Sequence, residues 1–234
     1  MTAIFKRELR AYFQSPLGYV FIAVMYFFTA YYFFTYNLYR NTTDMSTMFD
    51  QLFSVVIFLV PILTMRLMSE DKRSRTEQLL LTAPVSRMGI VLGKYFAAFC
   101  VYLVAISATI LMALVLSAYG EPTWPVIIGN MIGLVLLGAS LIAVCMFLSS
   151  LTESQVIAAV SGFAVSLLLV LLDALVHVVS GAVFQKLFSY MSFNGRYNGF
   201  TIGIIDFSNV LFFLSIAALF VLLTTAVLEK RRWS

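Results

Sequence analysis

The sequence predicts an all-α integral membrane protein with six transmembrane helices. Three observations lead to this prediction. First, 62% of the residues are hydrophobic and only 11% are charged, whereas a soluble domain is about 45–50% apolar and about 25% charged. Second, the apolar residues form long continuous runs, without the alternation that the strands of a membrane barrel need. Third, lysine and arginine gather in a few short connections, which is typical of multi-pass membrane proteins.

Six apolar runs are long enough to cross about 30 Å of hydrocarbon as helices. Pro61 interrupts the second run, where we expect a kink rather than a break, because neighbouring helices can satisfy the freed carbonyl group. The chain is therefore expected to form one six-span domain over residues 1–234. The runs cover residues 17–38, 51–68, 95–118, 126–148, 155–178 and 208–228.

The distribution of basic residues predicts the orientation. Only Arg40, Lys186 and Arg196 of the 15 Lys and Arg residues fall on the outer side when the N-terminus is placed inside. Cytoplasmic connections carry the excess of positive charge, so both termini are expected in the cytoplasm. An odd number of spans would separate the two basic ends, so an even number is favoured independently of hydropathy. The inner cations are Lys6, Arg7, Arg10, Arg66, Lys72, Arg73, Arg75, Arg87, Lys94, Lys230, Arg231 and Arg232.

Residues 1–16 precede the first span and are expected to form an interfacial helix. Helical spacing places Phe5, Leu9, Tyr12 and Phe13 on one side and the basic residues on the other. Such a helix lies in the headgroup layer with its cations near anionic lipid. The alternative is a basic flank that only fixes the topology.

Residues 69–94 form the only sizeable hydrophilic connection, on the inner side. Ser74 and Glu77 have the spacing of a capping box and predict the start of a short helix, and a second helix start follows at Ser86. Three consecutive leucines, residues 79–81, cannot all face the same way on so short a helix. They either dock on another protein or pack against the inner ends of the spans, and periodicity alone leaves both open.

Residues 179–207 form the outer connection between the fifth and sixth spans. This segment is too apolar for free solvent, and it is too polar and too rich in glycine to cross the membrane. We expect re-entrant or membrane-surface helices with turns at Asn194–Gly195 and Asn198–Gly199. A lipid-facing cap with no role in transport is the alternative.

The sequence contains no complete nucleotide-binding loop. Gly93 and Lys94 come nearest, but Met88 stands where the first glycine of such a loop should be, and Tyr95 stands where Ser or Thr would bind magnesium. The chain is therefore expected to carry no cofactor of its own and not to be an enzyme. No basic patch interleaved with aromatic residues suggests nucleic acid.

Few ionisable residues fall within the spans. Asp173 and His177 are one helical turn apart near the outer end of the fifth span. They form a proton relay of an ion-coupled carrier, half a metal site or, more ordinarily, a mutually satisfied pair. Cys100 and Cys145 fall inside apolar runs and are expected to be packing residues, without a disulfide or a metal.

Two further patterns lie within the spans. The first span is rich in aromatic residues, among which Tyr26, Tyr31 and Tyr32 are candidates for a substrate path, although an interfacial belt or lipid-facing packing is the more ordinary explanation. Gly129 and Gly133 form a GxxxG motif in the fourth span, which permits close helix contact within the bundle or across a dimer.

The stretch 61–94, PILTMRLMSEDKRSRTEQLLLTAPVSRMGIVLGK, resembles the signature region of permease subunits of type-2 ABC transporters, particularly gliding-motility-associated permeases. That region typically reads Met-Arg, an acidic pair, a basic pair, Gly-Thr-x-Glu, a run of leucines, Pro and Gly-Lys. Arg75 stands where the family usually has glycine. The segments AIFKRELRAYFQSPLGY, LSSLTESQ and LEKRRW extend the resemblance over nearly the whole chain.

The resemblance implies one half of an ATP-driven exporter in a prokaryotic cytoplasmic membrane. A second permease, identical or homologous, would pair with it, and two ATPase subunits carrying ATP and magnesium would dock underneath. The short helix between the second and third spans would be the coupling helix, which favours docking by its leucines, and the outer segment would correspond to the family's re-entrant helices. The ATPase contact would comprise Glu70, Asp71, Lys72, Arg73, Thr76, Glu77, Leu79 and Leu80, with a smaller second contact over residues 150–155 that includes Thr152 and Glu153.

Three functions are therefore weighed. The first is the permease subunit of an exporter, which works with membrane lipid around it and an ATPase below it. The second is an ion-coupled secondary carrier that uses Asp173 and His177. The third is a membrane scaffold that transports nothing.

Overall fold

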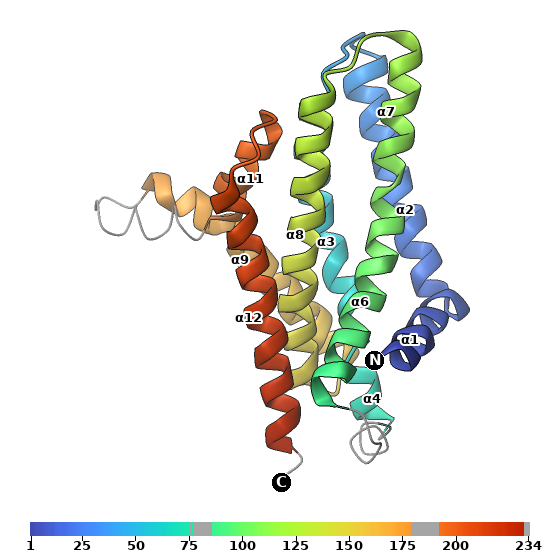
Figure 1. The fold of residues 1–234 in the computed structure, drawn as a ribbon, viewed down its shortest axis with the longest axis vertical. Coiled ribbons are helices and arrows are strands. Elements are labelled where there is room, and N and C mark those ends of the chain that lie inside the picture. The colour runs from blue at the N-terminus through green and yellow to red at the C-terminus, as the bar shows by residue number, and fades with distance from the viewer. Residues whose placement is uncertain (75, 77–85, 179–191, 232–234) are drawn as a thin grey trace.

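The computed structural model describes residues 1–74, 76, 86–178 and 192–231, and every element within these ranges is a helix. Most of the long helices run along one direction, and both termini lie toward the same end of the bundle, called here the terminal end (Figure 1). The elements are α1 (Thr2–Gln14), α2 (Pro16–Phe33), the π-helix η1 (Phe34–Leu38), α3 (Ser46–Thr64), α4 (Ser69–Arg73), α6 (Arg87–Ile106), α7 (Ala108–Tyr119), α8 (Trp124–Leu151), α9 (Gln155–Val178), α11 (Phe193–Thr201) and α12 (Phe207–Arg231).

Five helical stretches are long and apolar enough to cross a membrane, which confirms the all-helical membrane class. The predicted fifth span coincides with α9, of which Gln155–Leu171 is a shorter apolar stretch. The side chains of residues 172–178 lie outside the described part of the chain, so this fifth of the six predicted spans stays a prediction. The five stretches are Pro16–Leu38, Ser46–Arg73, Arg87–Tyr119, Trp124–Leu151 and Phe207–Lys230.

Helices α3 and α6 begin before the spans that hydropathy predicted. The helix start predicted at Ser86 is confirmed: α6 begins at Arg87, where the Oγ of Ser86 accepts a hydrogen bond from the backbone N–H of Gly89 at 3.2 Å. The third span, expected from residue 95, continues this helix without a break. The second span was expected from residue 51, but α3 begins at Ser46, whose backbone N–H donates to Asp44 Oδ1 at 2.9 Å. Both bonds satisfy an N–H group that a helix start leaves free, but only Ser86 is an N-cap, since the N-cap of α3 is Met45.

Helix α3 continues through Pro61 and ends three residues later, so the predicted absence of a break is confirmed. The Thr64 hydroxyl donates back to the Val60 carbonyl at 2.9 Å, near the end of the helix. On the neighbouring helix α9, a Cβ at Gly162 would lie 3.0 Å from Pro61 Cβ. The missing side chain of this glycine lets α9 pack directly on the proline ring.

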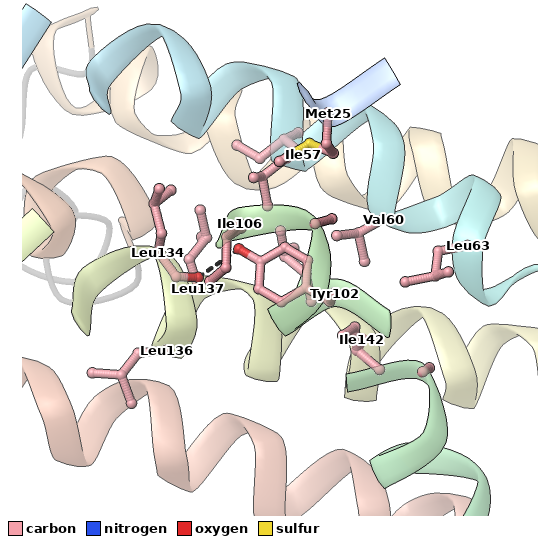
Figure 2. Close-up of a cluster of buried hydrophobic side chains, with 14 of the residues drawn as sticks. Met25, Ile57, Val60, Leu63, Tyr102, Ile106, Leu134, Leu136, Leu137 and Ile142 are labelled. Atoms are coloured by element: carbon pink, nitrogen blue, oxygen red, sulfur yellow. Dashed lines mark hydrogen bonds between the residues drawn. The ribbon is translucent and has the colours of Figure 1, made fainter. Parts of the chain in front are cut away.

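Helix α8 lies at the centre of the bundle and packs against α3, α6, α9, α11 and α12. Its Gly138 accepts the ring of Tyr102 from α6, which is fully buried and donates its hydroxyl to the Leu134 carbonyl at 2.6 Å (Figure 2). A Cβ at Gly138 would lie only 2.1 Å from Tyr102 Cε1. The close approach of α6 and α8 therefore depends on this glycine.

The predicted turns at Asn194–Gly195 and Asn198–Gly199 are wrong, because both pairs lie inside α11. The Oγ of Ser192 accepts a hydrogen bond from the Gly195 N–H at 2.9 Å and thereby starts the helix. The chain turns instead at Gly203, which has φ +80° and lies against α8. A short helix between the last two predicted spans agrees with the sequence, but its position relative to the lipid stays a prediction.

The GxxxG motif of α8 packs against α11 of the same chain. A Cβ at Gly129 would lie 3.0 Å from the Phe200 carbonyl oxygen, and a Cβ at Gly133 would lie 2.9 Å from Tyr197 Cε2. Asn130, between the two glycines, accepts the Tyr197 hydroxyl at 3.4 Å. The motif therefore serves contact within the bundle.

The expected helix at the N-terminus is present as α1, and it folds back closely on α2. Ser15 is extended, with φ −100° and ψ 154°, and Pro16 starts α2. A Cβ at Gly18 would lie 2.6 Å from the Tyr12 carbonyl oxygen, so only glycine permits this tight corner. Ile4 and Tyr12 of α1 are buried against the bundle.

We predict that Gly138→Ala destabilises the bundle by about 1–3 kcal/mol through overpacking, because the buried Tyr102 ring cannot move away. The measurement is the thermal unfolding midpoint of the purified protein in detergent. Tyr102→Leu removes the clashing ring atoms, so the double variant should be less destabilised than the sum of the two single changes. Additive effects would contradict the proposed contact.

Candidate functional site

A buried lysine holds three helices together at the terminal end. Lys94 of α6 is 2% exposed. Its Nζ lies 2.7 Å from Asp71 Oδ2 of α4 and 3.2 Å from Glu8 Oε1 of α1. It also donates to the Leu67 carbonyl, between α3 and α4, at 2.6 Å. A buried ammonium group is costly unless it is paired and hydrogen-bonded, so this position of Lys94 requires α1, α4 and α6 to stay together.

Asp71 connects this lysine to the segment that follows α4. Its Oδ2 also lies 3.6 Å from the Arg7 guanidinium group. Its Oδ1 accepts a hydrogen bond from the Thr76 hydroxyl at 3.0 Å. We call Arg7, Glu8, Asp71 and Lys94 the ion cluster. Two cations and two anions cancel in this cluster, so the chain gathers charge here without a net local charge.

Arg7 forms the exposed edge of the ion cluster, since 45% of its side chain is accessible. Burial lowers the pKa of Arg7, but its hydrogen bond to Glu8 and the negative charges of Glu8 and Asp71 outweigh that effect and raise it. Arginine is charged at all physiological pH values in any case. The cluster therefore keeps its positive edge at any pH at which the protein works.

Tyr12 closes α1 onto the end of α3. Its hydroxyl is buried and donates to the Leu63 carbonyl at 2.9 Å. Burial, followed by the negative charge of Glu8, raises the pKa of Tyr12 well above its ordinary value, so the hydroxyl stays neutral. Ile4 packs against Gly93 of α6. This contact and the Tyr12–Leu63 hydrogen bond hold α1 across the terminal ends of α3 and α6.

A serine of α8 joins the α3–α4 connection to the centre of the bundle. The Ser149 hydroxyl donates to the Met65 carbonyl at 3.0 Å and accepts hydrogen bonds from the backbone N–H groups of Met68 at 3.3 Å and Ser69 at 3.2 Å. These groups have no helical partners where α3 ends and α4 begins. One hydroxyl group therefore couples the position of α4 to that of α8.

The outward side of α4 carries a second set of charges. Lys72 lies 3.3 Å from Glu153 in the connection between α8 and α9. Arg66 and Glu70 form a two-point ion pair, with N–O distances of 2.6 and 2.8 Å. Arg66, Glu70 and Lys72 are partly buried, whereas Arg73 and Glu153 are exposed.

Comparison with known families identifies the chain. The family described as ABC-2 family transporter protein matches residues 11–227. The chain belongs to this family. It is a permease component of an ABC transporter and a multi-pass membrane protein, and such permeases generally work with a separate ABC ATPase rather than as catalysts themselves. No curated protein matches the permease in sequence.

The structure of the permease brings most of the predicted ATPase-contact residues to one end. Glu70, Asp71, Lys72 and Arg73 form most of α4, and Thr76 is tied to Asp71. Thr152 and Glu153 lie in the α8–α9 connection beside α4. Glu77, Leu79 and Leu80 lie outside the described residues, as does the rest of the predicted coupling helix. Ser74, predicted to start that helix, donates to the Glu70 carbonyl at 2.7 Å and ends α4.

The candidate path residues of the permease lie apart from this end. The Tyr26 hydroxyl lies 3.0 Å from Ser107 Oγ, between α6 and α7. Tyr31 is exposed, and Tyr32 stacks on Phe28 of the same helix. Their role in a substrate path stays a prediction. The side chains of Asp173 and His177, in α9, lie outside the described part of the chain.

Sequence reasoning missed the ion cluster as a unit. Reading the third span from residue 95 placed Lys94 in a hydrophilic connection, whereas it lies two helical turns inside α6 and is buried. Glu8 was not singled out, although it is the only acidic residue among the first 43. The helix start predicted at Ser86 is confirmed, but it was not joined to the third span, so Lys94 was not recognised as a buried lysine that needs an acidic partner.

We predict that Lys94→Met destabilises the permease by about 3–5 kcal/mol, because the change leaves Glu8 and Asp71 buried without their cation. Thermal unfolding of the purified protein in detergent measures the effect. Adding Asp71→Asn should recover part of the loss. Lys230→Met removes an exposed lysine at the same end and should change the midpoint little. Equal midpoints for Lys94→Met and Lys230→Met would refute the structural role of the ion cluster.

Proposed function

We propose that this permease is one half of an ATP-driven exporter of the prokaryotic cytoplasmic membrane, with the terminal end in the cytoplasm. A second permease copy, identical or homologous, forms the other half, and each half receives one ATPase subunit. The ATPase supplies ATP and magnesium. The proposal rests on family membership and on the gathering of α4, the α8–α9 connection and both termini at one basic end.

One observation carries the coupling part of the proposal: α4 is bonded to three different parts of the bundle. Asp71 joins it to α1 and α6 through Lys94, Ser69 and Met68 join it to α8 through Ser149, and Lys72 joins it to the α8–α9 connection. A displacement of α4, or of the residues after it, would therefore act directly on α1, α6, α8 and α9. Energetic coupling travels through contiguous hydrogen-bond and ion-pair networks of this kind.

In the proposed complex the exposed Arg73 and Glu153 and the partly buried Glu70 and Lys72 meet the ATPase, while the ion cluster behind them transmits the displacement. Glu70, Lys72, Arg73 and Glu153 form the docking surface. Thr76, Glu77, Leu79 and Leu80 extend this surface along the coupling helix, and Thr152 adds to the second contact. Charge pairs at the rim of an interface set orientation and association rate more than total affinity.

A charge reversal on the exposed side of α4 tests the proposed function. We predict that Arg73→Glu lowers ATP turnover by the permease–ATPase complex about tenfold, which corresponds to about 1.4 kcal/mol of lost interaction. The permease should keep its thermal unfolding midpoint, because Arg73 is exposed. The measurement is ATP hydrolysis by the copurified complex in lipid vesicles.

Lys230→Glu is the matched control, since it reverses an exposed cation at the same end on α12. It should leave ATP turnover unchanged. Unchanged turnover in Arg73→Glu would overturn the docking surface, and failure of any ATPase to copurify with the wild-type chain would overturn the proposed partnership.

The ion-coupled alternative gives a different result in the same vesicles. Transport driven by a proton or sodium gradient without an ATPase, and lost in Asp173→Asn, would favour a secondary carrier. A complex without substrate flux and without stimulated ATP turnover would favour a scaffold.

A further inference from the structure

A cleft between α1 and α6 opens on the surface of the permease beside the ion cluster. It has a volume of about 470 Å³. Helix α6 lines it with Phe96, Phe99, Cys100 and Leu103, which have the i, i+3, i+4, i+7 spacing of one helical face. This stripe extends along about 10 Å of helix. The start of α1 forms the other wall with Thr2 and Phe5.

The walls of this cleft suit a hydrocarbon chain rather than water. Phe96 is 40% exposed and Leu103 is 38% exposed, and both lie within a stretch that is apolar enough to cross a membrane. Helix α1 meets α6 one turn earlier, where Ile4 lies against Gly93. The cleft therefore begins beneath α1 and continues along α6 into the span.

The exposed side of α1 carries two cations next to the mouth of the cleft. Thr2 lines the cleft, and Lys6 and Arg10 follow it at successive i+4 positions, so the three residues lie along one stripe of the helix. Both cations are exposed and form no ion pair within the described part of the chain. Glu8, the only acidic residue of α1, faces Lys94 on the other side.

We propose that this cleft binds an anionic phospholipid, with one acyl chain along the α6 stripe and the phosphate group at Lys6 and Arg10. An apolar groove beside paired cations is complementary to a molecule with a hydrocarbon tail and a negative head. A second copy of the chain fits less well. In a two-fold contact the same patch meets itself, which would bring two positive stripes together.

The two cysteines of the permease allow a direct test with the intact chain. Cys100 is partly exposed in the cleft, whereas Cys145 is buried in α8 and serves as the internal reference. The permease is reconstituted in vesicles of phosphatidylcholine alone or with phosphatidylglycerol, and a membrane-permeant thiol reagent is added. We expect phosphatidylglycerol to slow the labelling of Cys100 and to remain bound in native mass spectra of the released protein.

Charge-neutralising variants identify the headgroup contact. A cation near a membrane surface contributes roughly a fivefold preference for anionic lipid, so Lys6→Gln and Arg10→Gln should each lower the preference for phosphatidylglycerol about fivefold. Lys230→Gln, on α12, should leave it unchanged. Cys100→Trp should fill the cleft and displace the bound lipid, and a retained unfolding midpoint would show that this variant is folded.

Any of the following three outcomes would overturn the proposal. Equal labelling of Cys100 in both vesicle types, with no preference in the mass spectra, would indicate ordinary surrounding lipid. Cross-linking of Cys100 to Cys100 by a short bifunctional thiol reagent, with equally slow labelling in both vesicle types, would indicate a contact between two copies. A headgroup preference that survives in the Lys6→Gln/Arg10→Gln double variant would place the lipid elsewhere.

Discussion

The ammonium group of Lys94 is the constraint on which the terminal end of the permease depends. In the apolar interior this charge is tolerated only where oxygen atoms surround it, and the three that do so come from Glu8, Leu67 and Asp71. These residues belong to two separate segments of the chain, so neither α1 nor the α3–α4 connection can leave α6 without exposing an unpaired charge to a poor solvent. A buried ion pair adds little net stability compared with apolar packing, and its value here is that it fixes one arrangement of three helices.

Small residues impose the corresponding constraint around α8. Lipid offers no hydrophobic force that would drive one apolar helix against another, so close contact and hydrogen bonds must supply the attraction. Gly138 admits the Tyr102 ring at the centre of the bundle (Figure 2), and Gly133 admits α11 farther along the helix. Near the terminal end of the same helix, Ser149 bonds the start of α4. Helix α8 thus carries contacts from α11 to α4, and a displacement at one end has a continuous packed route to the other.

Sequence alone predicted the membrane environment of this protein better than its helix ends and the contacts between its helices. The apolar runs were legible because each must be about 20 residues long whatever it contacts, and five of them are present as helices of sufficient length. Hydropathy placed the third span from residue 95, eight residues after α6 begins, because the helix start predicted at Ser86 was not joined to that span. The glycines at 195 and 199 suggested turns because glycine favours turns locally. The packing of α11 against α8, which local sequence does not show, keeps both residues in a helix. The contact residues of α4 were recognisable as a group, but the partnership of Glu8 with Lys94 joins positions 86 residues apart and could not be read from local pattern.

Helix α1 has two sides, and they link the membrane surface to the ion cluster. Ile4, Glu8 and Tyr12 recur at i+4 spacing and face the protein, where each makes a specific contact with α3 or α6. Lys6 and Arg10 recur at the same spacing on the opposite side and face outward. The two sides cannot move independently, because both belong to the same continuous helix. Under the proposed coupling, displacement of α4 would pull on α1 through Asp71, Lys94 and Glu8, and a lipid held at Lys6 and Arg10 would resist that movement. Lipid composition and ATPase-driven motion would then meet in the same helix.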